Sequence, residues 1–193
     1  MSDKNQAYGE EVFEMKHISK SFANTKALVD VNFSCKAGEV HAIIGENGAG
    51  KSTLINIMAG VVTPDSGELR LKDEVISFRN PSEAWENNIV AVFQELSLVP
   101  FLTVSENIFL GCEPRKGSMV DYRKMIEDSG NLLTELQFSI EPTDITGDLS
   151  LEQKQLVEIA KAISKDPDII IFDEATSALG SDQVDNLFRI IRE

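Results

Sequence analysis

Four residues in the first third of the chain have the types and spacing of a phosphate-binding loop. Gly45 is followed five residues later by Gly50, Lys51 and Ser52, which fits the pattern G-x-x-x-x-G-K-[ST]. Glycines let consecutive backbone N–H groups turn toward one anion, and the N-terminus of a following helix adds partial positive charge. In such a loop the lysine reaches the β- and γ-phosphates, and the serine hydroxyl is a ligand for Mg²⁺. The spacing therefore predicts a site for a nucleotide phosphate with Mg²⁺, lined by Gly45, Glu46, Asn47, Gly48, Ala49, Gly50, Lys51, Ser52 and Thr53.

Polar residues that follow two apolar runs are a second set of candidates. Gln94 follows the run 89–93, and Asp173 and Glu174 follow the run 169–172. Because ligand sites in α/β proteins gather at the carboxyl ends of strands, Gln94 and Asp173 are candidate ligands for Mg²⁺ or its water. Glu174 is a candidate to orient the attacking water or accept its proton. A solvated turn would also suit the acidic pair, and a surface loop would suit Gln94.

Three further polar or aromatic residues each allow two interpretations. Phe22 can fill the core, or its ring can lie open as a stacking platform for a base. Ser150 and Gln153 satisfy S-x-x-Q, which predicts an ordinary helix N-cap, although a role as nucleotide ligands is equally compatible. The pattern of residues does not decide between these alternatives.

Composition limits the class of protein. The chain has 193 residues, of which 42% are hydrophobic and 26% charged, so it has the composition of a soluble globular protein and the length of one domain. A formal net charge of −14 argues against a nucleic-acid surface and against direct binding to anionic lipid. Residues 1–11 are polar, and no run approaches the ~20 apolar residues of a membrane span, which predicts a cytosolic or peripheral protein. Cys35 and Cys112 lack C-x-x-C spacing, which favours buried reduced thiols.

The elements that position the loop are predicted from periodicity. Residues 12–18 and 29–35 alternate as strands, 68–71 and 75–78 continue the same antiparallel layer, and Asn80 begins a short helix. The apolar run 40–44 is predicted to be the strand that leads into the loop, and 54–59 to belong to the helix that follows it.

From residue 95 to about 165 the pattern becomes helical. Thr103 to Glu106 is a capping-box sequence, 122–136 carries an apolar stripe, and 154–164 has an apolar face. The continuous apolar run 169–172 is typical of a strand buried on both faces of a parallel sheet. We expect a helical insertion in an α/β core, without internal repeats.

Together these motifs resemble the ATP-binding subunits of ABC transporters, over nearly the whole chain from about Val12. Residues 45–53 resemble the Walker A loop, Gln94 the Q-loop glutamine, 149–153 the signature, and 169–173 Walker B with Glu174 as the catalytic glutamate. Ser177 to Leu179 resembles the start of the D-loop, and Phe22 matches the aromatic that stacks on adenine. Residues 95–100, 103–111 and 155–162 are most similar to the ribose, galactose and xylose type of sugar importer.

The resemblance implies a P-loop NTPase fold, with an α/β core, an antiparallel β-subdomain and an inserted helical subdomain at about 95–165. The expected organisation is a polar tail over 1–11 and an ABC domain over 12–193, C-terminally truncated before the switch-histidine region. Such subunits carry two ATP-binding domains in one chain, and this sequence resembles the start of the first. Two domains enclose two ATP molecules, so Ser150 and Gln153 would face the nucleotide of the partner domain.

Three features depart from the pattern of the family. Leu151 and Glu152 replace two small residues of the signature, and Gly180 occupies the position of the D-loop aspartate. The only histidines are His17 and His41, both upstream of the phosphate loop, so we expect little or no turnover by this chain alone. A carboxylate at position 152 would approach the γ-phosphate of a partner unfavourably unless the side chain turns away.

The resemblance implies the ATP-binding subunit of a carbohydrate importer, which hydrolyses Mg-ATP to drive sugar uptake. Expected partners are ATP, a second ATP-binding domain, transmembrane permease subunits contacted near residues 94–104 and, indirectly, a sugar-binding protein. The expected location is the cytoplasmic side of the membrane, as a peripheral subunit, without nucleic acid. Two alternatives are a degenerate or regulatory nucleotide-binding module without turnover, and a soluble ABC protein outside transport. The net charge of −14 counts against the latter.

Overall fold

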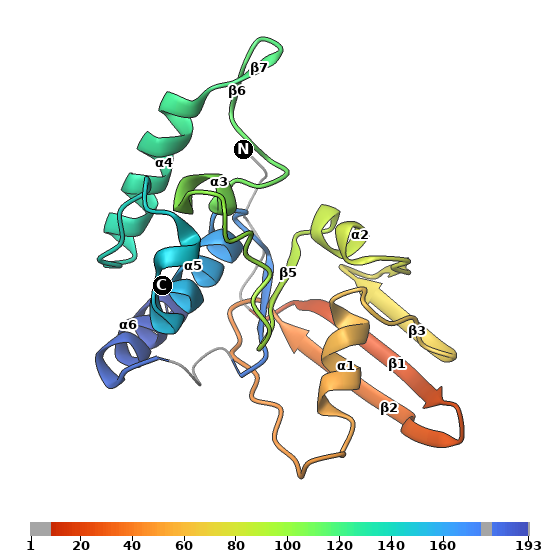
Figure 1. Cartoon of the computed structure of the whole chain (residues 1–193). Helices are drawn as coiled ribbons and strands as arrows, with labels where there is room; N and C mark the ends of the chain where they lie inside the picture. Colours follow the sequence, from red (N-terminus) through yellow and green to blue (C-terminus); the bar gives the residue numbers. More distant parts are fainter. Residues whose placement is uncertain (1–8, 175–178, 193) are drawn as a thin grey trace. The chain divides into compact units, whose positions relative to one another are not determined.

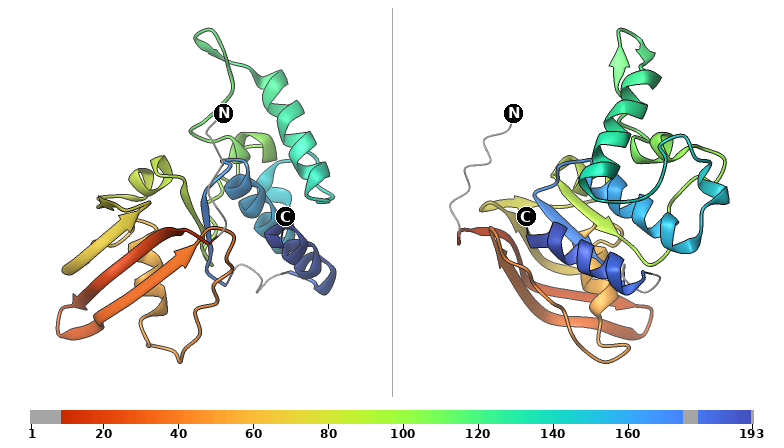
Figure 2. Two further views of the ribbon diagram at one scale, coloured as in Figure 1. Left: turned by 180° about the vertical axis from the view of Figure 1, so that it is seen from behind. Right: turned by 90° about the vertical axis from the view of Figure 1, so that its left-hand side faces the viewer.

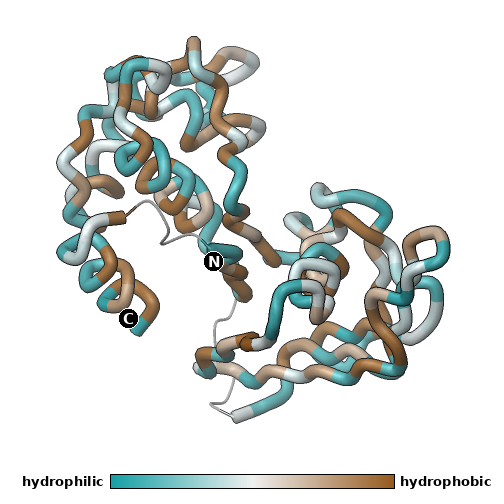
Figure 3. Tube along the Cα trace, turned by 60° about the horizontal axis from the view of Figure 1, so that its bottom comes forward, coloured by the Kyte–Doolittle hydropathy of each residue, from teal (hydrophilic) through white to brown (hydrophobic). Residues whose placement is uncertain are grey.

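A computed structural model describes residues 9–174 and 179–192. The chain divides into two compact units, unit 1 (Met1–Ile89) and unit 2 (Val90–Glu193). Elements of mixed type follow one another along the chain, as Figure 1 shows. In the described part, no helix has both the length and the apolar character needed to cross a membrane, and hydrophilic and hydrophobic stretches alternate along the tube in Figure 3.

Unit 1 is built on an antiparallel sheet of four strands in the order β2-β1-β3-β4. The strands are β1 (Glu11–Phe22), β2 (Thr25–Lys36), β3 (Ser66–Leu71) and β4 (Glu74–Ile76), as predicted from alternation. Helix α1 (Lys51–Met58) packs against β2, and α2 (Pro81–Glu86) follows β4, with its N-terminus capped by the Asn80 side chain. Both views in Figure 2 place α1 on one face of this sheet.

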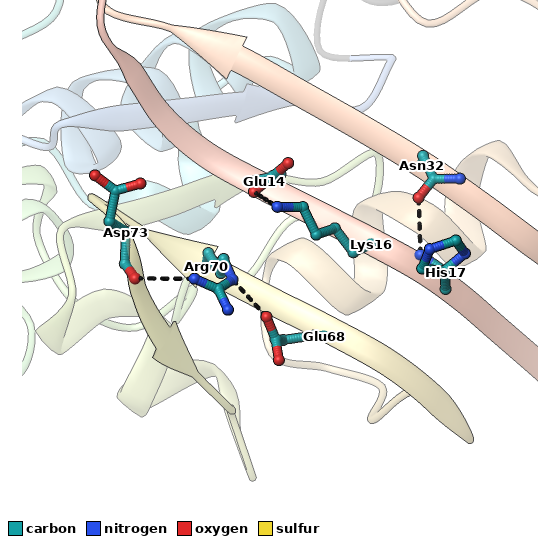
Figure 4. Close-up of polar contacts among 7 residues, drawn as sticks. All are labelled: Glu14, Lys16, His17, Asn32, Glu68, Arg70 and Asp73. Carbon is teal, nitrogen blue, oxygen red and sulfur yellow. Dashed lines mark hydrogen bonds and ion pairs between the residues drawn. The ribbon is translucent and has the colours of Figure 1, made fainter.

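The two faces of β1 differ because side chains alternate along a strand. Phe13 and Met15 are almost fully buried, whereas Glu14 and Lys16 point to the other face. There Glu14 lies opposite Arg70 of β3, and Figure 4 shows ion pairs that join Lys16 to Glu14 and Arg70 to Glu68. Alternating charges therefore cover the outer face of the sheet.

The strand predicted for residues 40–44 is absent, and this prediction was wrong. These residues lie in no helix or strand, and Val40 and Ile44 are 74% and 91% exposed. A strand needs a neighbour for its backbone N–H and C=O groups. In the described sheet of unit 1, β1 pairs with β2 and β3 and no strand pairs with residues 40–44. Apolar character alone did not form the strand.

Unit 2 contains the helices predicted beyond residue 95. These are α3 (Val104–Ile108), α4 (Tyr122–Glu135) and α5 (Leu151–Ile163), followed by α6 (Ser181–Arg192), with a 3₁₀ turn at Thr146–Asp148. Strands β5 (Ile89–Val92) and β8 (Ile169–Phe172) pair with each other. A hairpin of β6 (Arg115–Lys116) and β7 (Met119–Val120) interrupts the helical stretch, which the sequence did not predict.

The core of unit 2 forms around α5, whose Val157, Ile159 and Ala160 are fully buried. Side chains from α3, α4 and α6 join them, including Ile108, Leu133 and Leu187. Strand β8 is less buried than predicted, because only Ile171 of its four residues is fully buried. Both cysteines are free, but Cys112 is exposed and Cys35 half-buried, so the prediction of buried thiols was wrong for Cys112, which lies in the loop after α3.

Candidate functional site

The predicted phosphate loop is an exposed turn that leads directly into α1. Residues 45–49 are all exposed, and Gly50 is the N-cap of the helix, with a φ of 90°. A Cβ on Gly50 would lie 2.6 Å from the carbonyl oxygen of Ala27, so only glycine fits this approach to β2. Glycine has no capping side chain, and the first turn of α1 holds no acidic residue. No side chain at these positions therefore competes with a bound anion for the first N–H groups of the helix.

The Lys51 ammonium group is held inside this loop. Its Nζ donates to the carbonyl oxygens of Gly45 at 2.8 Å and Glu46 at 2.9 Å. The N–H of Ala49 also donates to Glu46, at 3.1 Å, which closes the turn around the lysine. A phosphate oxygen is a better partner for an ammonium group than a neutral carbonyl. The loop therefore presents a cation that can exchange two weak acceptors for a phosphate. Ser52, the next residue of the chain, is exposed.

Phe22 lies at the end of β1 with its ring open to solvent. It is 48% exposed, which agrees with the stacking interpretation and not with the core one. Asp65 fixes the backbone beside it, because its carboxylate accepts from Lys20 Nζ at 2.8 Å and from the N–H of Ser21 at 2.7 Å. These two bonds lower the pKa of Asp65 below its usual value, with the Lys20 bond as the larger cause. Lys20 Nζ also lies 5.7 Å from the centre of the Phe22 ring.

The polar residues predicted at strand ends all belong to unit 2. The N–H of Asp173 donates to the carbonyl oxygen of Val92 at 2.9 Å, so Asp173 continues the pairing of β8 with β5. Gln94 follows Val92 by two residues and is exposed. Glu174 is also exposed, with a φ of 53° that a non-glycine residue rarely adopts. Ser177 and Ala178 of the predicted D-loop lie outside the described residues.

Ser150 and Gln153 form a capping box at the start of α5. The N–H of Gln153 donates to Ser150 Oγ at 3.2 Å, and the N–H of Ser150 donates to Gln153 Oε1 at 3.0 Å. The structure thus shows the N-cap alternative. Ser150 is exposed and Gln153 is half-buried.

The segment between Gln94 and α3 is tied to two helices by residues that the sequence analysis missed. Asn107 of α3 is fully buried, and its side chain accepts the N–H of Val99 at 2.8 Å and donates to the Val99 carbonyl at 3.0 Å. Glu158 of α5 is 8% exposed and accepts the N–H of Ser97, while Lys161 Nζ donates to Ser97 Oγ at 3.0 Å. A charged residue in an apolar stretch of the helix was the available signal, since Glu158 stands between Val157 and Ile159 in the sequence.

A magnesium site built from protein ligands alone is absent from the described residues, where no three His, Cys, Asp or Glu side chains cluster. Mg²⁺ beside a nucleotide requires few protein ligands, because phosphate oxygens and waters supply the rest. Ser52 in unit 1 and Asp173 with Gln94 in unit 2 are hard oxygen donors of the type that Mg²⁺ prefers. The donor chemistry of these residues fits the ion.

Comparisons with known proteins agree on one family. Residues 28–177 match the family model described as ABC transporter. A putative ribose/galactose/methyl galactoside import ATP-binding protein of Pseudomonas syringae pv. tomato is 45% identical over 183 residues, which are 94% of this chain and 35% of the relative. The arabinose import ATP-binding protein AraG of Yersinia pestis is 46% identical over 176 residues, 91% of this chain and 34% of the relative. The chain thus spans about a third of the length of these curated relatives.

Solved structures support the same assignment. An ATP-binding cassette of an ABC transporter, in its ADP conformation, aligns with a TM-score of 0.80 and 30% identity, covering 95% of this chain and 76% of that one. Another ATP-binding cassette, a dimer in a post-hydrolysis state bound to ADP and Pi, aligns with a TM-score of 0.76 and 27% identity, over 93% and 81% of the two chains.

Proposed function

Because this chain belongs to the ABC transporter family, we propose that it is the ATP-binding part of a carbohydrate importer, where it binds and hydrolyses Mg-ATP to drive sugar uptake. The observation that carries the proposal is the exposed glycine loop that opens α1 without a side-chain cap and holds the Lys51 ammonium group. Relatives named for the import of ribose, galactose, methyl galactoside or arabinose favour a monosaccharide as the transported substrate.

The loop binds the nucleotide through its phosphates. The N–H groups at the start of α1 donate to the phosphate oxygens, and Lys51 leaves its two carbonyl partners to neutralise the β- and γ-phosphates. Phe22, half-exposed at the end of β1, stacks on the adenine base. Backbone donors and one lysine give affinity without help from the net charge of −14, which repels polyanions at long range.

Hydrolysis requires charge stabilisation and a positioned water. Ser52 of the phosphate loop would hold a Mg²⁺ ion on the nucleotide, which would neutralise charge on the β- and γ-phosphates. In unit 2, Asp173 and Gln94 are the proposed ligands for Mg²⁺ or its water. Glu174 accepts the proton of the attacking water, or orients that water, and Gln94 helps to hold it in line. Asp173 keeps its position because its own N–H is bonded to β5.

A second ATP-binding domain, in the same or another chain, completes the site. Ser150 and Gln153 lie at the N-terminus of α5, whose partial positive charge suits the γ-phosphate of the nucleotide on the partner domain. The capping box already orders both side chains, so they need little rearrangement to accept that contact.

We also propose that membrane permease subunits are the partners of the segment around residues 94–104, and that the protein is located at the cytoplasmic side of the membrane. Phe101 is 88% exposed. The backbone on either side of it is nevertheless fixed, because the Pro100 carbonyl accepts the N–H of Gly147 at 2.8 Å and the Leu102 carbonyl accepts the N–H of Thr146 at 3.0 Å. A large ring presented on a fixed backbone is typical of an interface anchor. A sugar-binding protein would act through those subunits.

Phosphate release from ATP tests the proposal. Wild-type protein is compared with Glu174→Gln, which removes the base, and with Glu127→Gln, a matched change on the exposed face of α4. We expect release by the wild type and by Glu127→Gln and none by Glu174→Gln, measured under single-turnover conditions so that slow catalysis remains visible. Equal release by all three would contradict the role of Glu174.

A module that binds nucleotide without turnover is the second candidate, because Glu152 puts a carboxylate in the first turn of α5, next to the proposed γ-phosphate contact. In that case a fluorescent ATP analogue binds to the wild type while single-turnover phosphate release is absent. The two measurements on one preparation separate the candidates.

A further inference from the structure

Glu152 and Gly180 lie against each other in unit 2, although 28 positions separate them in the sequence. Oε1 of Glu152 accepts the backbone N–H of Gly180 at 3.3 Å. Both are positions at which the sequence departs from the expected pattern of the family, a carboxylate in place of a small residue and a glycine in place of an aspartate. The two departures therefore meet in one contact.

The contact joins the N-termini of two helices. Glu152 belongs to the first turn of α5. Gly180 immediately precedes α6, and its carbonyl oxygen accepts the N–H groups of Gln183 at 3.1 Å and Val184 at 3.0 Å, as an N-cap residue does. A negative charge is favourable at a helix N-terminus, and the Glu152 carboxylate is bonded at the N-terminus of α6.

The Glu152 carboxylate lies where a side chain at position 180 would begin. A Cβ built on Gly180 would lie 3.3 Å from Glu152 Oε1, closer than an ordinary van der Waals contact, and among the described residues other than its chain neighbours no second atom lies within 4 Å. Any side chain at position 180 would thus meet the Glu152 carboxylate first. An aspartate there would bring two carboxylates together, which is unfavourable for both.

We propose that Glu152 and Gly180 are a matched pair of positioning residues. The bond turns the Glu152 carboxylate back onto its own chain, away from the anion that the N-terminus of α5 faces, and it fixes the start of α6 to the start of α5. This inference rests on the proposed function, in which Ser150 and Gln153 contact the nucleotide of a partner domain. Glu152 is then compatible with turnover, because its side chain is engaged within its own unit.

The contact itself is tested without nucleotide by the amide proton resonance of Gly180 in the ¹⁵N-labelled chain. An amide bonded to a carboxylate resonates downfield, so Glu152→Ala is expected to move the Gly180 signal upfield. Glu127→Ala, an exposed glutamate of α4, is the matched control and is expected to leave it in place. A Gly180 signal that responds equally to both variants would overturn the contact.

The functional consequence is tested by second-site rescue of ATP-dependent pairing between two copies of the chain, all in a Glu174→Gln background. Gly180→Asp is expected to weaken pairing about threefold or more, and Glu152→Gln in the same chain to restore it. Gly180→Asn, of equal size without charge, is expected to weaken it less. The proposal would be overturned if Gly180→Asp and Gly180→Asn weakened pairing equally and Glu152→Gln failed to restore pairing in the Gly180→Asp chain.

Failure of the proposed function has a different signature. Absence of ATP-dependent pairing in the unmodified background would overturn the composite site and, with it, the functional part of this inference. The Gly180 resonance would still decide whether the two residues form a bond.

Discussion

Residues 45–50 and residues 97–102 are both irregular segments that lead into a helix, α1 in unit 1 and α3 in unit 2. The first is exposed from Gly45 to Ala49 and is held mainly by its own Lys51. The second is held by side chains from other elements, with Asn107 on Val99 and Glu158 on Ser97. A segment that must wrap a ligand is left without bonds to other elements, whereas a segment that must hold a position has backbone groups bonded to buried side chains.

The largest expected effect is a loss of stability when the bonds that hold residues 97–102 are removed. Asn107→Ala leaves the N–H and C=O of Val99 and the Thr146 hydroxyl without the partners that the Asn107 amide now supplies. Because buried polar groups without partners are costly, we expect the free energy of unfolding to fall by about 2–4 kcal/mol. Urea unfolding measures it, with the exposed Asn131→Ala of α4 as the control. A loss below about 0.5 kcal/mol would show that the segment is held by other contacts.

Lys51→Ala tests the phosphate loop, where we expect a loss of ligand affinity and almost no change in stability. Its ammonium group contacts only carbonyls of its own exposed loop among the hydrogen bonds described, so stability is expected to change by less than about 0.5 kcal/mol. Affinity for a fluorescent ATP analogue is expected to fall about tenfold to a hundredfold, since a hydrogen bond to a charged group contributes about 1.5–3 kcal/mol. Lys116→Ala, which changes an exposed lysine of β6 in unit 2, is the control. Equal affinity of the wild type, Lys51→Ala and Lys116→Ala would show that Lys51 of the loop does not bind the nucleotide.

Phe22→Ala separates base recognition from phosphate recognition within unit 1. Loss of stacking is expected to cost about 1–3 kcal/mol of ATP binding, by analogy with nucleic-acid bases, and to leave pyrophosphate binding unchanged. Isothermal titration with both ligands measures this. Phe188→Ala is a matched control, because Phe188 is also 48% exposed but belongs to α6 of unit 2. A similar loss of affinity for ATP and for pyrophosphate would indicate that Phe22 has a structural role and does not stack on the base.

The smallest effect concerns Asp65, the anchor beside Phe22. Its pKa is lowered in the folded chain by Lys20 and the Ser21 N–H, so the charged form contributes stability above the unfolded pKa of about 3.9. That contribution is lost as the pH falls through the lower, folded pKa. We therefore expect wild type and Asp65→Asn to differ in urea unfolding at pH 7 and to converge in strong acid. If the difference in stability between wild type and Asp65→Asn did not change with pH, the charge of Asp65 would not contribute to it.

Most elements were predictable because their signals are local. Alternation located β1 and β2, and the capping sequences at Thr103 and Ser150 located the starts of α3 and α5, where the structure shows both reciprocal bonds. The hairpin at 115–120 was missed because two-residue strands carry no periodicity. The strand predicted for 40–44 was wrong because a strand depends on a neighbour, which a single run of residues does not specify.

Of the candidate site, the sequence by itself determined the chemistry: the glycines, Lys51 and Ser52 of the loop, and the carboxylates after 169–172, follow from residue type and spacing. Only the tertiary structure decided that Phe22 is open, that Asn107 and Glu158 hold the segment after Gln94, and that Glu152 bonds to Gly180. Spacing along the chain encodes groups that act within a few residues of one another. Contacts between residues 28 or 61 positions apart, as in the bonds of Glu152 and Glu158, depend on how helices pack around a shared core.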